Sequence, residues 1–433
     1  MNRRDFLKGS LTAAILAPLA KLAAKTGADG DKSSDLAKGE QVARRRYKNT
    51  GLTVPLLGFG MMRLPRINPD KPDIDYATAE KQIIRALEAG VNYFDTAYFY
   101  HGGLSEKCAG DLLSKFPRDS YYLTSKMPVR SVRSEADVKR IFEEQLKKCK
   151  TDYFDFYLVH NLNADRWKTT IRFKVYEYLQ EQKKNGRIRK LGFSFHDEPE
   201  VLETIAKARP WDFAQIQLNY LDWTLYRSKE QYEILTRYGI PVIIMEPLRG
   251  GALASLNQEA VSILKKANPE VSAASWAFRY AASLPNVLCV LSGMTLTEHL
   301  EDNIKTFTHF KPLTEAERQV IAQALAAYRK SGAIPCTECR YCMPCPVGVQ
   351  IPRIFGLYNH YKLTGNYGHF RMVYDKMPED EQASACVSCG ACLKKCPQKI
   401  RIPEEMKKIA DELKKDRRHA LFLSPEHCGM ELG

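Results

Sequence analysis

Eight short apolar segments alternate with helix-forming segments between residues 54 and 310 of the chain. They are rich in β-branched and aromatic residues, as strands are, and cover residues 54–60, 93–97, 121–126, 154–160, 189–195, 214–220, 241–247 and 287–293. Apolar strands that alternate with helices are typical of a parallel sheet covered by helices. Eight such units favour closure into an α/β fold, the (β/α)8 TIM barrel. A doubly wound open sheet is the alternative, but the G-x-G-x-x-G turn expected after an early strand is absent from the sequence.

The composition excludes several classes of protein. The 433 residues include 44% hydrophobic and 10% aromatic side chains, which is enough to build a large core. The net charge of +14 comes from 65 Lys and Arg that are spread along the chain and mixed with acids, as at residues 139–150. Because no nucleic-acid-binding motif accompanies them, we expect no nucleic-acid partner. No apolar run approaches the ~20 residues of a membrane-spanning helix, so we expect no stable membrane span.

The first 28 residues have the features of an export signal. A charged start is followed by an apolar stretch and then by small residues near Ala28. Arg3 and Arg4, followed by Asp5-Phe6-Leu7, resemble the twin-arginine (Tat) signal. We therefore expect Tat export of the folded protein to the periplasm or the outer face of the cytoplasmic membrane. Residues 29–45 are polar and rich in small side chains, which predicts a linker.

Eight of the twelve cysteines form two closely spaced runs near the C-terminal end of the sequence. The runs are Cys336, Cys339, Cys342 and Cys345-Pro346, then Cys386, Cys389, Cys392 and Cys396-Pro397. Thiols spaced three residues apart point at one centre and are badly placed to form disulfides with each other, so the spacing indicates metal ligation. The scattered residues Cys108, Cys149, Cys289 and Cys428 are expected to be small buried apolar side chains.

The second run, C-x2-C-x2-C-x3-C-P, matches the two-cluster bacterial ferredoxin pattern, in which the fourth Cys binds the other cluster. The first run has two residues rather than three before its last Cys, which leaves the fourth ligands open. Crossed ligation would assign one 4Fe-4S cluster to Cys336, Cys339, Cys342 and Cys396, and the other to Cys386, Cys389, Cys392 and Cys345. A zinc-stapled domain is the alternative, and it predicts a colourless protein without acid-labile sulfide.

Four ionisable residues follow the ends of three neighbouring predicted strands. Asp95 and Tyr100 come at and just after the second strand, Lys126 ends the third and His160 ends the fourth. The carboxyl ends of barrel strands share one rim, where the chemistry of such barrels takes place. Each residue alone has an ordinary structural explanation, but their joint placement predicts a catalytic site.

The sequence at this rim resembles the aldo-keto reductase family over residues 46–310. The resemblance is carried by AGVNYFDTAYFYHGGLSE (89–106), LTSKMP (123–128), DYFDFYLVHNL (152–162), GRIRKLGFSFH (186–196) and HLEDNI (299–304). It implies that Asp95, Tyr100, Lys126 and His160 are the catalytic tetrad. Tyr100 would be the general acid, helped by Lys126, which stabilises phenolate and is held by Asp95, while His160 orients the carbonyl oxygen. The leader and the two cysteine runs are similar to an iron–sulfur branch of the family.

The resemblance also implies a nicotinamide site, NADP or NAD, with several departures from the family pattern. Ser194 and Gln215 fall where the family binds the carboxamide, and Phe195 stands where an Asn is usual. Met245 replaces the common stacking Tyr, and is a weaker platform. At the adenosine end, His299, Asp302 and Asn303 stand where Arg, Glu and Asn are common, so the choice between NADPH and NADH stays open.

The expected organisation is a signal peptide (1–28), a linker (29–45), a reductase barrel (46–311), a connector helix (312–332) and a small, mainly helical ferredoxin-like two-cluster domain (333–433). We expect an oxidoreductase that transfers hydride between NAD(P)H and a small carbonyl or alcohol, with two 4Fe-4S clusters for electron transfer to a redox partner. The alternative is an electron-transfer or assembly subunit whose barrel has no turnover. The aromatic residues between the two runs are expected to pack in a core rather than to contact a cofactor.

Overall fold

The computed structural model describes residues 41–47, 50–68 and 71–422, with side chains to residue 414. The chain divides into two compact units. We call the first the barrel unit, which runs to Pro247 and resumes over Ala274–Glu315, and the second the cysteine unit, which comprises Leu248–Ala273 and the chain from Ala316. The predicted leader, most of the predicted linker and Cys428 lie outside the described residues.

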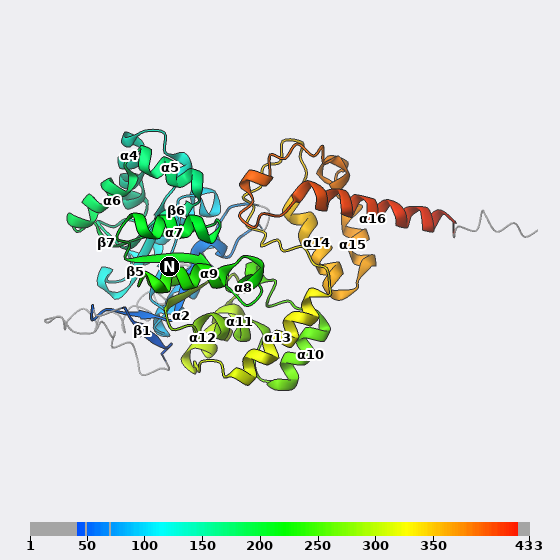
Figure 1. Ribbon diagram of the computed structural model, residues 1–433, viewed down its shortest axis with the longest axis horizontal. Coiled ribbons are helices and arrows are strands. Elements are labelled where there is room, and N and C mark those ends of the chain that lie inside the picture. Colours follow the sequence, from blue (N-terminus) through cyan, green and yellow to red (C-terminus); the bar gives the residue numbers. More distant parts are fainter. Residues whose placement is uncertain (1–40, 48–49, 69–70, 423–433) are drawn as a thin grey trace, which may run out of the picture. The chain divides into compact units, whose positions relative to one another are not determined.

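Eight parallel strands close into a barrel in the barrel unit (Figure 1), so the predicted TIM barrel is confirmed and the open sheet is excluded. The strands follow one another around the barrel in chain order, and β10 pairs with β3 to close it. They are β3 (Leu57–Gly60), β4 (Tyr93–Asp95), β5 (Tyr122–Met127), β6 (Phe154–Leu162), β7 (Ile188–Phe195), β8 (Phe213–Gln217), β9 (Val242–Met245) and β10 (Val287–Ser292). Side chains fill the barrel interior, as in other barrels of this size.

Helices follow the strands of the barrel and cover it. They are α2 (Tyr76–Glu88), α3 (Ser105–Leu113), α4 (Glu135–Lys148), α5 (Ala164–Arg172), α6 (Val175–Lys184), α7 (Pro199–Ala208), α8 (Asp222–Leu225), α9 (Ser228–Arg237), α11 (Ala273–Ala282) and α12 (Thr297–Thr308). Helix α2 begins where the Asp75 side chain accepts a hydrogen bond from the Thr78 N–H, 3.1 Å away. It is followed by Gly90, whose φ of 78° is readily adopted by glycine.

The first predicted strand differs from expectation because it divides in two. Strand β2 (Thr53–Pro55) pairs antiparallel with β1 (Arg44–Arg46), and β3 then enters the barrel. Tyr47, which follows β1, and Val54, in β2, are buried with the barrel residues Tyr93, Tyr122 and Phe156. The hairpin therefore adds to the barrel core, which explains why β1 takes in the last two residues of the predicted linker.

The cysteine unit is mainly helical. Its helices are α10 (Gln258–Ala267), α13 (Glu315–Arg329), α14 (Ile351–Thr364), α15 (Tyr367–Tyr374) and α16 (Ile402–Phe422). Its core contains the aromatic residues Phe355, Tyr358, Phe370 and Tyr374, which pack with apolar side chains of α16 such as Met406 and Ile409. The aromatic stripe between the cysteine runs is therefore core, as predicted.

The loop after β9 differs from the expected domain boundary, because residues 248–273 belong to the cysteine unit. The Asn257 side-chain amide donates to the Ala327 carbonyl on α13 (3.0 Å), and Lys330 pairs with Glu259 at 3.1 Å. These contacts between segments far apart in sequence hold α10 against α13. Helix α13 itself lies within the predicted connector, 312–332.

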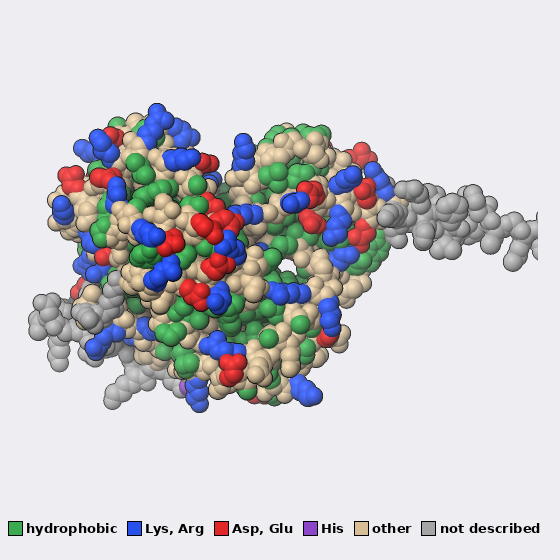
Figure 2. Space-filling view, in the orientation of Figure 1, with side chains coloured by type: hydrophobic (Ala, Val, Ile, Leu, Met, Phe, Trp, Pro, Cys, Tyr) green, Lys and Arg blue, Asp and Glu red, His purple; other side chains and the backbone are tan. Residues whose placement is uncertain are grey.

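Figure 2 shows Lys and Arg side chains interspersed with Asp and Glu over the face in view. This mixed surface agrees with charge that is spread along the sequence. No helix among the described residues is long and apolar enough to cross a membrane. Three of the scattered cysteines, Cys108, Cys149 and Cys289, are buried as expected.

Candidate active site and cysteine pocket

The four predicted catalytic side chains meet at the carboxyl ends of β4, β5 and β6. The Lys126 ammonium donates to Asp95 Oδ1 (2.6 Å), to the Thr96 carbonyl (2.9 Å) and to the Tyr100 hydroxyl (3.3 Å). Tyr100 begins a short 3-10 turn after β4, and its ring lies edge-on to the His160 ring with centroids 6.3 Å apart. The site thus forms from neighbouring strands, and Lys126 directly contacts both the carboxylate and the phenol.

Burial governs the protonation of these groups. Lys126 and Asp95 are 1% and 3% exposed, and burial raises the pKa of Asp95 although the Lys126 charge opposes that shift. Burial, with the nearby carboxylates of Asp95 and Glu246, raises the pKa of Tyr100 well above its ordinary value. Burial also lowers the pKa of His160 well below its ordinary value, with Lys126 adding to the effect. At neutral pH Tyr100 is therefore a phenol and His160 a neutral imidazole.

The predicted role of Lys126 in stabilising a phenolate stays a prediction, and the structure adds what keeps Tyr100 protonated before reaction. The ammonium does contact the Tyr100 hydroxyl, but burial and the two carboxylates outweigh it in the protein without ligand. Tyr100 consequently holds its proton, which suits a general acid.

A buried hydrogen-bond network holds the backbone of Lys126. It was not predicted from the sequence. The Glu106 carboxylate on α3 accepts hydrogen bonds from Ser125 and Gln145, and Gln145 also donates to the Lys126 carbonyl at 3.0 Å. Tyr157 on β6 donates to Gln145. A signal was present in the sequence, because Glu106 shares its face of α3 with the apolar residues Ala109 and Leu113, an unusual position for a charge.

The predicted carboxamide-binding residues are neighbours in the barrel. Ser194 on β7 and Gln215 on β8 are register partners, 1% and 2% exposed. The Gln215 amide donates to Asp95 Oδ2 (3.2 Å), while its Oε1 is buried and has no hydrogen-bond partner. The Ser194 hydroxyl accepts from the Asn161 N–H at 2.7 Å, which leaves its own proton to be donated. An acceptor beside a donor fits a primary carboxamide, so these residues fit a nicotinamide.

The remaining residues predicted to contact the nucleotide differ in their burial. Met245 is partly buried at the end of β9, one residue before Glu246. Asn303 on α12 is buried and donates to the Ser292 hydroxyl at 3.0 Å, so it supports the end of β10. His299 is exposed in the first turn of α12. Asp302 on the same helix is partly buried.

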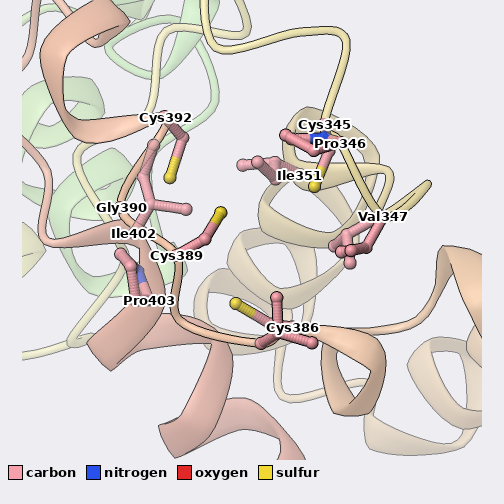
Figure 3. A pocket seen from close by; sticks show the side chains of 12 residues that line it. Cys345, Pro346, Val347, Ile351, Cys386, Cys389, Gly390, Cys392, Ile402 and Pro403 are labelled. Carbon is pink, nitrogen blue, oxygen red and sulfur yellow. The ribbon is translucent and has the colours of Figure 1, made fainter.

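In the cysteine unit, four thiols from both runs line one pocket (Figure 3). The sulfurs of Cys386, Cys389 and Cys392 point into the same space as that of Cys345, which comes from the first run. We call these four residues the second set. The space around these sulfurs, open solvent included, is about 330 Å³, and its walls include Val349, Ile351 and Ile402.

The other cysteines of the two runs, Cys336, Cys339, Cys342 and Cys396, we call the first set. Burial, together with the neighbouring Cys339 and Cys396, raises the pKa of Cys342 to about 12. Burial likewise raises the pKa of Cys336. A ligand that stabilises thiolates is therefore needed to deprotonate these residues. Nothing in the sequence analysis pointed to Arg249, whose guanidinium lies near two members of this set.

The donor chemistry of both sets fits 4Fe-4S clusters. Each set supplies four cysteine sulfurs, and cysteine thiolates are the usual ligands of such clusters. In the second set the four sulfurs surround one pocket.

Comparisons with known proteins agree with both units. The family model described as "Aldo/keto reductase family" matches residues 56–326, and the "4Fe-4S dicluster domain" model matches residues 335–400. L-galactose dehydrogenase of Arabidopsis thaliana is 24% identical over 63% of this chain and 90% of its own. The NADH-specific methylglyoxal reductase of Escherichia coli is 26% identical over 47% of this chain and 67% of its own.

The solved structures place the fold in the same group. The holo form of aldo-keto reductase AKR11C1 from Bacillus halodurans is 25% identical, covers 66% of this chain and 96% of its own, and superposes with a TM-score of 0.55. With the closed barrel and the rim residues described above, these matches show that the chain is an oxidoreductase that belongs to the aldo/keto reductase family and carries a 4Fe-4S dicluster domain.

Proposed function

We propose that the protein catalyses hydride transfer between a bound NAD(P)H and a small carbonyl or alcohol substrate, and that two 4Fe-4S clusters exchange electrons with a partner. The observation that carries the proposal is the contact of Lys126 with both Asp95 and Tyr100 at the rim where Ser194 and Gln215 lie side by side. This arrangement places the proposed acid, Tyr100, at the same rim as the residues proposed to bind the carboxamide, Ser194 and Gln215.

In this proposal the chain's own residues manage the proton and the oxygen atom. A bound reduced nicotinamide supplies a hydride to the carbonyl carbon. The protonated Tyr100 donates its proton to the carbonyl oxygen, so that the substrate leaves as an alcohol. Lys126 stabilises the phenolate that remains, and Asp95 holds Lys126 in position. Neutral His160 donates a hydrogen bond that orients the oxygen.

Gln215 and Ser194 would hold the nicotinamide. The unpartnered Gln215 Oε1 accepts from the carboxamide amine, and the Ser194 hydroxyl donates to the carboxamide oxygen. Met245 contributes a sulfur platform beside the ring. For the adenosine end, His299 and Asn303 are the proposed contacts, with NADP and NAD both admitted because no arginine stands at the predicted 2′ position.

For the clusters we propose crossed ligation, with the first set of cysteines binding one cluster and the second set the other. The support is the pocket shared by Cys345 with the three cysteines of the second run. An electron-carrying partner protein belongs to the proposal, because Cys389 is exposed and the neighbouring Lys394 and Lys395 would attract an acidic surface. Tat export to the periplasm or the outer face of the cytoplasmic membrane is proposed from residues 1–28.

The test begins with protein that has been expressed with its leader and purified anaerobically. After denaturation, we would quantify nicotinamide nucleotide by chromatography, together with iron and acid-labile sulfide. We expect near-stoichiometric nucleotide and about eight irons with matching sulfide. The intact protein is then mixed with NADPH or NADH and a set of small aldehydes. Methylglyoxal comes first, because one relative is named for its reduction.

The outcomes separate the candidate functions. NAD(P)H oxidation that depends on an aldehyde supports the reductase. Full iron and sulfide with no bound nucleotide and no NAD(P)H oxidation would instead support a subunit that transfers electrons without turnover. Zinc in place of iron and sulfide would contradict the cluster assignment.

A further inference from the structure

Arg249 is one of the largest fully buried side chains in the described part of the chain. It follows β9 by four residues, belongs to the cysteine unit and is 2% exposed. A buried guanidinium is costly unless it is hydrogen-bonded and compensated by charge. Its location therefore needs a reason, and the residues around it supply one.

The guanidinium joins the two cysteine runs. Its Nη2 donates to the Pro335 carbonyl (2.9 Å), immediately before Cys336, and to the Gln398 side chain (3.1 Å), two residues after Cys396. Cys336 and Cys396 come from different runs, and both belong to the first set. Arg249 thus ties together the two segments that must meet for that set to form.

The backbone next to Arg249 also packs against the first cysteine run. Gly250 has a φ of 68°, and a Cβ on this residue would lie 2.4 Å from the Thr337 carbonyl oxygen. Thr337 lies between Cys336 and Cys339, so the turn after β9 packs directly on the first cysteine loop. A larger residue at position 250 would push this loop away.

The charge on Arg249 faces the first set. The groups whose charges act on Arg249 are Tyr328 and two members of the first set, Cys336 and Cys396. Burial lowers the pKa of Arg249 only to about 10, so the side chain keeps its proton at neutral pH. The residue therefore supplies a positive charge between the segments that carry Cys336 and Cys396.

We propose that Arg249 holds the first set of cysteines together and raises the reduction potential of the cluster that this set binds. The inference rests on the crossed ligation proposed above. When such a cluster takes up one electron, its negative charge increases by one and no bond is made or broken. A fixed positive charge favours the more negative state, and charge is one of the factors that set these potentials. Arg249 is thus a positioning and tuning residue for the cluster of the first set.

The test is a redox titration of the full-length protein with dithionite, followed by electron paramagnetic resonance of the two clusters. Three variants are compared with the wild type. Arg249→Gln removes the charge and keeps a hydrogen-bond donor, Arg249→Lys keeps the charge, and Arg371→Gln removes a charge elsewhere in the cysteine unit, on α15, where Arg371 pairs with Asp375 at 2.9 Å. Iron and acid-labile sulfide are measured for each protein.

We expect Arg249→Gln to lower the reduction equilibrium constant of one cluster about tenfold, which is about 59 mV for a one-electron couple. The other cluster keeps its potential, Arg249→Lys shifts much less, and Arg371→Gln shifts neither. Selective loss of one cluster in Arg249→Gln, restored by Arg249→Lys, also supports the proposal. Unchanged potentials, or equal changes in both clusters, overturn it. Wild-type protein without iron and sulfide would overturn the proposed clusters as well, whereas two unshifted clusters overturn only the role of Arg249.

Discussion

The two units differ in the surroundings of their buried ionisable groups. In the barrel unit the buried ionic groups at the site bond to neighbouring side chains, Lys126 to Asp95 and Glu106 to Ser125 and Gln145. In the cysteine unit, burial raises the pKa values of the first-set thiols Cys336 and Cys342, and the thiols of the second set line a pocket. The barrel site is thus organised without a ligand, and we expect the cysteine unit to depend more strongly on its ligands for stability.

Removal of the clusters should have the largest effect, and it should affect the two units differently. Treatment of the protein with an oxidant and a chelator is expected to abolish amide protection in α14 and α15, because metal binding and folding are coupled in small metal-binding domains. Amides of β4 to β8 should keep their protection in the same sample, and hydrogen exchange with mass spectrometry measures both. Equal loss of protection in the two units would contradict the prediction.

Tyr100→Phe should disable the barrel unit alone. Loss of the general acid is expected to lower kcat about 10²- to 10⁴-fold. The clusters should still exchange electrons with dithionite at the wild-type rate. Tyr98→Phe is the matched control, because Tyr98 is on the same loop but bonds Glu144 rather than Lys126. Equal turnover by the Tyr100 and Tyr98 variants would contradict the assignment.

Acid should destabilise the barrel unit through its buried histidines. Burial lowers the pKa of His101 to about 4 and of His196 to about 3, and it also lowers that of His160. The unfolded chain binds these protons near pH 6.5 while the folded barrel does not, so stability falls as pH drops from about 6.5 towards 4. Each histidine contributes a slope of at most about 1.4 kcal/mol per pH unit.

Tryptophan fluorescence in urea checks this slope, because Trp167, Trp211, Trp223 and Trp276 all belong to the barrel unit. His101→Gln should reduce the dependence of the unfolding free energy on pH by up to about 1.4 kcal/mol per pH unit, the contribution of one proton. The glutamine side chain can still accept from the Leu64 N–H, which His101 bonds at 3.1 Å. An unchanged slope in this variant would exclude His101 as a contributor.

The smallest expected effect concerns the platform for the nicotinamide. Met245→Tyr should lower the Kd for the nucleotide about two- to tenfold, because an aromatic stacking contact is worth about 0.5–1.5 kcal/mol. Met245→Leu keeps an apolar side chain without a ring and should change little. Calorimetric titration of nucleotide-free protein measures both. If the Tyr variant binds the nucleotide no better than the Leu variant, the nicotinamide ring does not lie beside residue 245.

Local sequence patterns were enough to predict much of the fold. Strand-like segments alternating with helices predicted the eight-stranded barrel, and because parallel strands end on one rim, the pattern also predicted that Asp95, Lys126 and His160 would meet. Cysteine spacing predicted a dicluster domain, which the family match confirms. These inferences succeed because periodicity and close spacing act over a few residues.

Other features were decided by tertiary structure, because they depend on residues far apart in the chain. The assignment of residues 248–273 to the cysteine unit follows from contacts such as Asn257 with Ala327. The high pKa of Tyr100 comes from burial and from Asp95 and Glu246, which outweigh Lys126. Arg249 meets Pro335 and Gln398 across 86 and 149 residues of sequence. Local sequence carries no signal for such contacts, since their energy arises only when packing removes water from both sides.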